Sequence, residues 1–120
     1  MKSTIILLAL LTSAFGYTSD IKDLQNTFEK SLFLEPVVNK CSKKFKGDYR
    51  STYSGWINKN VMQIVEGLEQ LKKSSGGELT EGLIMAQYAE KITKLTEELS
   101  KLSDEELKAR CDAAMEAMSS

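Results

Sequence analysis

Few side chains in this sequence combine the types and spacing that catalysis needs. The chain contains two cysteines, Cys41 and Cys111, and no histidine. Without histidine there are no Ser-His or Cys-His nucleophile pairs, no imidazole general base and none of the usual zinc or di-iron sites. Adjacent carboxylates occur at 97–98 and 105–106, but neighbouring helical residues point about 100° apart and cannot share one substrate bond. The sequence therefore predicts a protein that is not an enzyme and has no catalytic residue, metal site or cofactor.

The N-terminal segment indicates the compartment in which the cysteines react. Residues 1–16 contain Lys2, an apolar run over 5–11, and the small residues Ala14 and Gly16 at the positions that signal peptidase recognises. The apolar run is too short to cross the ~30 Å core of a bilayer. We expect 1–16 to be a signal peptide and 17–120 to be one exported domain without stable membrane insertion. The periplasm of a bacterium is the expected location, and the extracellular space is the alternative.

Two isolated cysteines in an oxidising compartment are most simply explained by one disulfide bond. The loop that Cys41 and Cys111 would close is long, and the loop-entropy description gives roughly 4 kcal/mol of stabilisation. The alternative is two buried free thiols. The wide separation in sequence excludes a CxxC redox pair.

The helices that position these residues follow from the spacing of apolar side chains. No run of alternating apolar and polar residues is long enough to predict a sheet. A helix from about residue 20 should stop before Pro36, because proline disfavours a helical conformation in the preceding residue. A short second helix should then run from Pro36 to Gly47.

The second half of the chain predicts three more helices. Two long ones begin near residues 49 and 80, and the short turn at 74–77 between them predicts an antiparallel hairpin. The stretch 103–106 is a capping box that begins the last helix. The predicted fold is all-α: a small bundle of about five helices, two of them long and antiparallel, stapled by one disulfide.

An aromatic stripe runs along the first of the two long helices. Tyr49, Tyr53, Trp56 and Asn60 fall within about 60° of helical arc. This stripe is either core or a binding surface. Asn60, in an apolar stripe, should bond to a tyrosine hydroxyl, a backbone carbonyl or water, and could fix the register of the helices. Gly67 on the same arc predicts a close approach of another helix.

Charge is unevenly distributed along a chain whose net charge is −1. The near-neutral balance argues against a nucleic-acid partner. Basic residues gather near the first cysteine, at Lys40, Lys43, Lys44, Lys46 and Arg50. Acidic residues gather near the second, at Glu97, Glu98, Asp104, Glu105 and Glu106. The clusters are interpreted either as solvated helix faces that attract weakly, or as a basic patch for an acidic partner or lipid headgroups.

The order of these features resembles a known group of proteins. A cysteine, then "YRSTYSGWINKN", then "LSDEELKARC" is similar to uncharacterised small exported bacterial proteins that are all-helical. The resemblance covers Cys41 to Cys111. It implies a periplasmic location and a Cys41–Cys111 disulfide, and it implies no catalytic residue.

These observations favour an exported, non-enzymatic module that binds another protein. Exported helical bundles of this size with one disulfide include immunity proteins that block secreted toxins, so an immunity-like or inhibitor-like role is the most specific form. The alternative function is a carrier of a small apolar ligand, held in a bundle interior rich in Tyr, Met and Leu.

Overall fold

The structure, a computed structural model, describes residues 2–119, with side chains described for residues 21–119. This part of the chain forms four α-helices: α1 (Lys2–Lys44), α2 (Tyr49–Ser74), α3 (Glu81–Ser100) and α4 (Asp104–Met118). The predicted all-helical class is therefore confirmed. Within the described residues, no helix combines the length and the apolar character that crossing a membrane requires.

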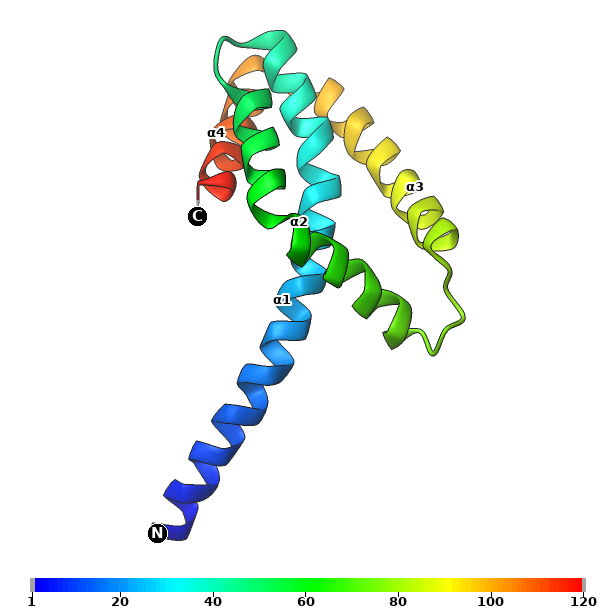
Figure 1. The fold of residues 1–120 in the computed structure, drawn as a ribbon. Helices are drawn as coiled ribbons and strands as arrows, with labels where there is room; N and C mark the ends of the chain where they lie inside the picture. Colours follow the sequence, from blue (N-terminus) through cyan, green and yellow to red (C-terminus); the bar gives the residue numbers. More distant parts are fainter. Residues whose placement is uncertain (1, 120) are drawn as a thin grey trace.

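Helix α1 is the centre of the fold. Helices α2, α3 and α4 each pack on it, and α2 also contacts α4 (Figure 1). The blue N-terminal half of α1 extends beyond the other helices (Figure 1). That half contains the predicted signal peptide, whose first residue and side chains lie outside the described part. Its removal stays a prediction.

The expected lengthwise pairing of the two long helices is wrong. Helices α2 and α3 are joined by a turn with two positive-φ glycines, Gly76 and Gly77, but each helix packs on α1 rather than along the other. The reason is that each has a single narrow buried stripe. The stripe of α2 contains Tyr49, Trp56 and Gly67, and the stripe of α3 contains Ile84, Tyr88 and Leu99. Both stripes are buried against residues of α1, and a stripe does not specify which helix covers it.

The expected helix break at Pro36 is also wrong, so there are four helices and not five. Helix α1 continues through Pro36 to Lys44. Proline inside a helix costs about 3 kcal/mol, because it has no N–H to donate to the carbonyl four residues earlier. The flanking side chains of Leu34 and Val38 are buried on one face of α1, and full burial of such a side chain contributes about 1.5–3 kcal/mol. Burial along one continuous face therefore offsets the local preference.

The disulfide bond joins Cys41 of α1 to Cys111 of α4, as the sequence predicted. Both cysteines are completely buried. They lie in the larger of two core clusters, which we call the disulfide cluster; its other buried residues are Leu34, Val38, Tyr49, Trp56, Leu99, Leu107, Ala114 and Met118. A smaller cluster, the aromatic cluster, contains Phe28, Ile84 and Tyr88.

Helix α2 crosses α1 at Gly67, which confirms the close approach expected there. A Cβ at this position would overlap the carbonyl oxygen of Leu24 and would lie 2.9 Å from Phe28 Cβ. Gly55, in the same helix, has no atom within 4 Å of the corresponding position. The two glycines therefore differ in their surroundings: α1 lies against Gly67, whereas Gly55 faces open space.

Replacing Gly67 by alanine should lower the free energy of unfolding by about 1–3 kcal/mol, because the methyl group must push α2 away from α1. The matched control, Gly55→Ala, should raise it by about 0.5–1 kcal/mol through helix propensity alone. Urea unfolding followed by circular dichroism measures both. Equal stability of Gly67→Ala and the parent would contradict the close crossing.

Replacing both Cys41 and Cys111 by alanine should lower the free energy of unfolding by up to about 4 kcal/mol, because the disulfide closes a long loop in the unfolded chain; the cysteines are 70 residues apart. The same urea experiment measures this change. Mass measurement of alkylated, unreduced protein is the control. Two free thiols in that sample would contradict the bond.

Candidate functional site

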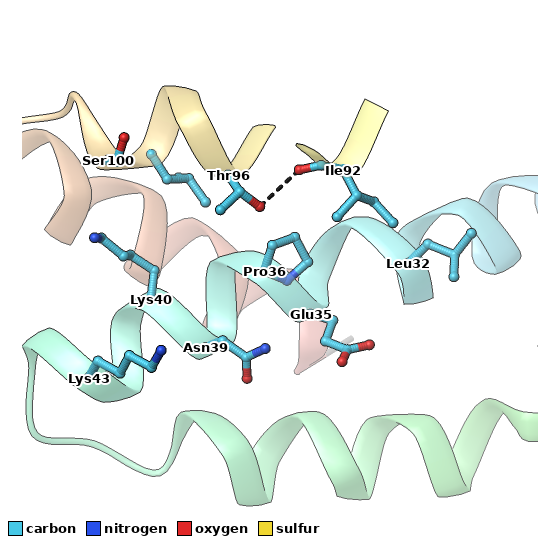
Figure 2. A pocket seen from close by; sticks show the side chains of 10 residues that line it. Leu32, Glu35, Pro36, Asn39, Lys40, Lys43, Ile92, Thr96 and Ser100 are labelled. Carbon is cyan, nitrogen blue, oxygen red and sulfur yellow. Dashed lines mark hydrogen bonds between the residues drawn. The ribbon is translucent and has the colours of Figure 1, made fainter. Parts of the chain in front are cut away.

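A groove of about 540 Å³ lies between α1 and α3 (Figure 2). It is open to solvent along one side. Helix α1 contributes Leu32, Glu35, Pro36, Asn39, Lys40 and Lys43, and helix α3 contributes Ile92, Thr96, Leu99 and Ser100. We call this feature the α1–α3 groove.

The groove follows the helix axes. The α1 residues that line it recur every three or four positions from Leu32 to Lys43, and those of α3 recur in the same way from Ile92 to Ser100. Such spacing keeps side chains on one face of a helix. At 1.5 Å per residue, the α1 strip is about 16 Å long, or three turns.

The groove lies beside the face through which α3 packs on the core. Ile84 and Tyr88 belong to the aromatic cluster, Leu99 belongs to the disulfide cluster, and Leu95 packs against that cluster. Next to this packed face, short side chains face the gap, among them Pro36 and Thr96 (Figure 2). Neither side chain is long enough to fill the space between the helices.

One end of the groove contains apolar side chains together with Glu35, and the other end is cationic. Leu32 and Ile92 lie at the first end, whereas Lys40 and Lys43 lie at the other (Figure 2). Neither lysine forms an ion pair with any described residue, although the neighbouring Lys44 pairs with Asp104 at 3.2 Å. The cationic end therefore carries two charges without a bound counter-charge from the described part of the chain.

The two hydroxyl groups of the groove are already used as donors. Thr96 Oγ1 donates to the Ile92 carbonyl at 2.9 Å (Figure 2), and Ser100 Oγ donates to the Glu97 carbonyl at 2.6 Å. Asn39 Oδ1 accepts a hydrogen bond from Arg50. A ligand in the groove would therefore meet the ammonium groups of Lys40 and Lys43 as its charged donors, and the amide of Asn39 as a neutral one.

The structure divides the basic patch that the sequence suggested. Only Lys40 and Lys43 line the groove. Lys44 pairs with Asp104, Arg50 bonds to Asn39, and Lys46 is exposed in the loop after α1. The Lys44–Asp104 pair links the basic cluster to the acidic one, but both side chains are solvent-exposed, so the pair contributes little stability.

The aromatic stripe of α2 lies away from the groove. Tyr49 and Trp56 are buried in the disulfide cluster, and Tyr53 Oη donates to the Ser31 carbonyl of α1 at 2.6 Å. Asn60 Nδ2 donates to the Trp56 carbonyl in its own helix, at 2.8 Å. This hydrogen bond does not connect two helices.

Two interhelical contacts have no signal in the sequence. Lys30 Nζ of α1 donates to the Ala117 carbonyl in the last turn of α4 and lies 5.1 Å from the centre of the Trp56 ring. Tyr88 Oη of α3 donates to Glu29 Oε1 at 2.6 Å. Each contact joins residues far apart in sequence, so no local pattern could reveal it.

Among the described side chains, three groups have shifted pKa values, and none of them lines the groove. Burial raises the pKa of Tyr53 to about 12, and the charge of Glu35 adds to the shift. Burial also raises the pKa of Tyr88, as does its hydrogen bond to Glu29. Hydrogen bonds to Asp112 and Tyr49 raise the pKa of Lys108. These shifts stabilise neutral tyrosines and a charged lysine at neutral pH, which is the opposite of activation for acid–base catalysis.

Comparisons with known protein families, curated proteins and solved structures gave no match. Among the described side chains, no three His, Cys, Asp or Glu residues gather closely enough to hold a metal ion. The α1–α3 groove is therefore the candidate site on geometry alone.

The pKa shift of Tyr53 predicts a loss of stability in alkali. Because its pKa is about 10 in the unfolded chain and about 12 in the folded protein, the stabilisation is complete below pH 10 and is lost as the pH rises from 10 to 12. A Tyr53→Phe variant should lose less stability over this range than the parent.

Urea unfolding across this pH range, with phenolate absorbance recorded in parallel, measures the effect. The control is Tyr49→Phe, because Tyr49 has no hydrogen bond to α1 among those described. If all four tyrosines of the parent ionise together near pH 10, the shift is absent.

Proposed function

We propose that this protein is an exported, non-enzymatic module that binds another protein through the α1–α3 groove. The observation that supports the proposal is the groove itself: it is open, three helical turns long, lined by apolar side chains and Glu35 at one end and by two lysines at the other. Export follows from the predicted signal peptide and is compatible with the Cys41–Cys111 disulfide.

The shape of the groove favours a protein segment over a small molecule. Sites for small ligands bury about 70–90% of the ligand surface. The α1–α3 groove is open on one side, so a small apolar ligand would remain partly in water. When a segment of another protein lies in the groove, the rest of that protein can cover the open side, so that the apolar contacts are removed from water.

The groove is held in place before any partner arrives. Lys40 is adjacent to the disulfide-bonded Cys41, and Leu99 is both a lining residue and a member of the disulfide cluster. A preformed site loses less conformational entropy on binding. This rigidity also suits the more specific proposal, an immunity-like or inhibitor-like protein that acts by occupying a partner.

The second candidate function is a carrier of an amphiphilic small ligand. The groove volume of about 540 Å³ lies within the range of about 300–1,000 Å³ typical of ligand pockets. This site differs from the bundle interior that the sequence suggested, because it lies at the surface between α1 and α3. Lys40 and Lys43 would then hold an acidic headgroup.

Filling the groove should abolish partner binding. In a Thr96→Trp variant the indole would occupy the middle of the groove, and we expect affinity for the partner to fall at least about tenfold because a central contact area is blocked. Thr93→Trp is the matched control, because Thr93 makes the same type of hydrogen bond within α3 but does not line the groove.

The partner is first captured from the exported fraction of the source cells with oxidised protein 17–120. It is then purified, and its affinity and stoichiometry are measured by calorimetry with the parent and both variants. Equal binding by the parent and Thr96→Trp would exclude the groove as the docking surface. Native mass spectrometry of the protein as purified tests the carrier: a bound small molecule lost in Thr96→Trp would favour it.

A further inference from the structure

We infer that the occupant of the α1–α3 groove is an acidic amphipathic α-helix, which lies lengthwise on α1 and α3 as a third helix. This inference rests on the proposed function and names the class of partner that the groove fits. It is carried by the spacing of the lining residues and by the two lysines at one end.

The spacing of the lining residues matches a helical occupant. On α1 the strip runs 32, 35, 36, 39, 40, 43, and on α3 it runs 92, 96, 99, 100. Steps of three and four residues on two neighbouring helices form the seam into which a third helix inserts its own side chains. An occupant of three turns, about 11 residues, would match the ~16 Å length of the α1 strip.

The polarity of the groove sets the composition of the occupant. Apolar side chains of the helix would contact Leu32, Pro36 and Ile92. Glu35 lines the same end, so acidic groups of the occupant are disfavoured there. Carboxylates would reach Lys40 and Lys43, which form no ion pair with any described residue. Complementary charge of this kind speeds association and selects against basic partners.

The same charges set the direction of the occupant. Acidic residues are most favourable in the first turn of a helix, where the macrodipole is positive. The first turn would therefore lie at the lysine end, near residues 40–43, and the helix would run toward Leu32 and Ile92. That direction is antiparallel to both α1 and α3, whose lining residues increase in number toward the lysine end.

A second exposed apolar surface provides an internal control. Met62 of α2 is 77% exposed, and Val61 and Val65 beside it are also exposed. These residues lie outside the groove. The charged residues beside them on α2 have both signs, as Lys59 and Glu66 show, so they do not specify the charge of an occupant. A Met62→Ser variant should leave binding in the groove unchanged.

Two labelled synthetic peptides test the inference with oxidised protein 17–120. Both have leucines at heptad spacing over three turns; one has glutamates in its first turn and the other has lysines there. Fluorescence anisotropy should show saturable binding of the acidic peptide and at least about tenfold weaker binding of the basic one. Lys40→Glu with Lys43→Glu should invert this preference.

Lys59→Glu with Lys73→Glu is the matched control, because it makes the same change in net charge at exposed positions of α2 outside the groove. It should leave the preference for the acidic peptide intact, as should Met62→Ser. Thr96→Trp should abolish binding of both peptides. Circular dichroism and a free-thiol assay establish that each variant is folded and oxidised.

The outcomes separate this inference from the proposed function. If Thr96→Trp blocks the captured partner but neither peptide binds the parent, the groove is a docking site and the helical occupant is wrong. If the peptides bind equally and the lysine reversal has no effect, the acidic character is wrong. If decanoate binds in the groove and the acidic peptide does not, a carrier replaces both proposals.

Discussion

Burial of apolar side chains around the second half of α1 is the constraint on which the rest of the structure depends. Leu34, Val38 and Cys41 are almost completely buried, and three other helices are needed to cover the faces of α1 on which such residues lie. Both core clusters contain residues of α1, so each of the other helices attaches to it. The disulfide makes one of these attachments covalent, and Lys30 adds another contact between α1 and the last turn of α4.

The groove is a consequence of this arrangement. Helix α2 crosses α1 closely, because Gly67 removes the side chain that would keep the helices apart. Helix α4 is held to α1 by the disulfide. Helix α3 has neither device and is attached through apolar side chains, with Ile84 and Tyr88 in the aromatic cluster and Leu95 and Leu99 at the disulfide cluster. Beside this packed face the helices do not close on each other, since Pro36 and Thr96 present little volume.

The last helix begins as its local sequence predicted. The capping box at Ser103 and Glu106 forms with both of its hydrogen bonds, because all its atoms lie within one turn. The break at Pro36 was wrong because burial over several turns outweighs the preference of one residue. The hairpin was wrong because a helical stripe specifies which residues are buried but not which helix covers them. The groove could not be predicted for the same reason. Lys40 and Lys43 can be recognised in the sequence as charged residues, but the α3 residues that line the groove with them depend on which helices pack together.

The attachment of the helices has a consequence for recognition. The lysine end of the groove belongs to α1, next to the buried disulfide, so Lys40 and Lys43 are presented from a fixed backbone. The opposite wall belongs to α3, which is attached through Ile84 and Tyr88 in the aromatic cluster and through Leu95 and Leu99 at the disulfide cluster. Both walls are therefore fixed before a partner binds, which lowers the entropic cost of binding. Charge selection is a property of the α1 wall, because only α1 contributes lysines to the groove.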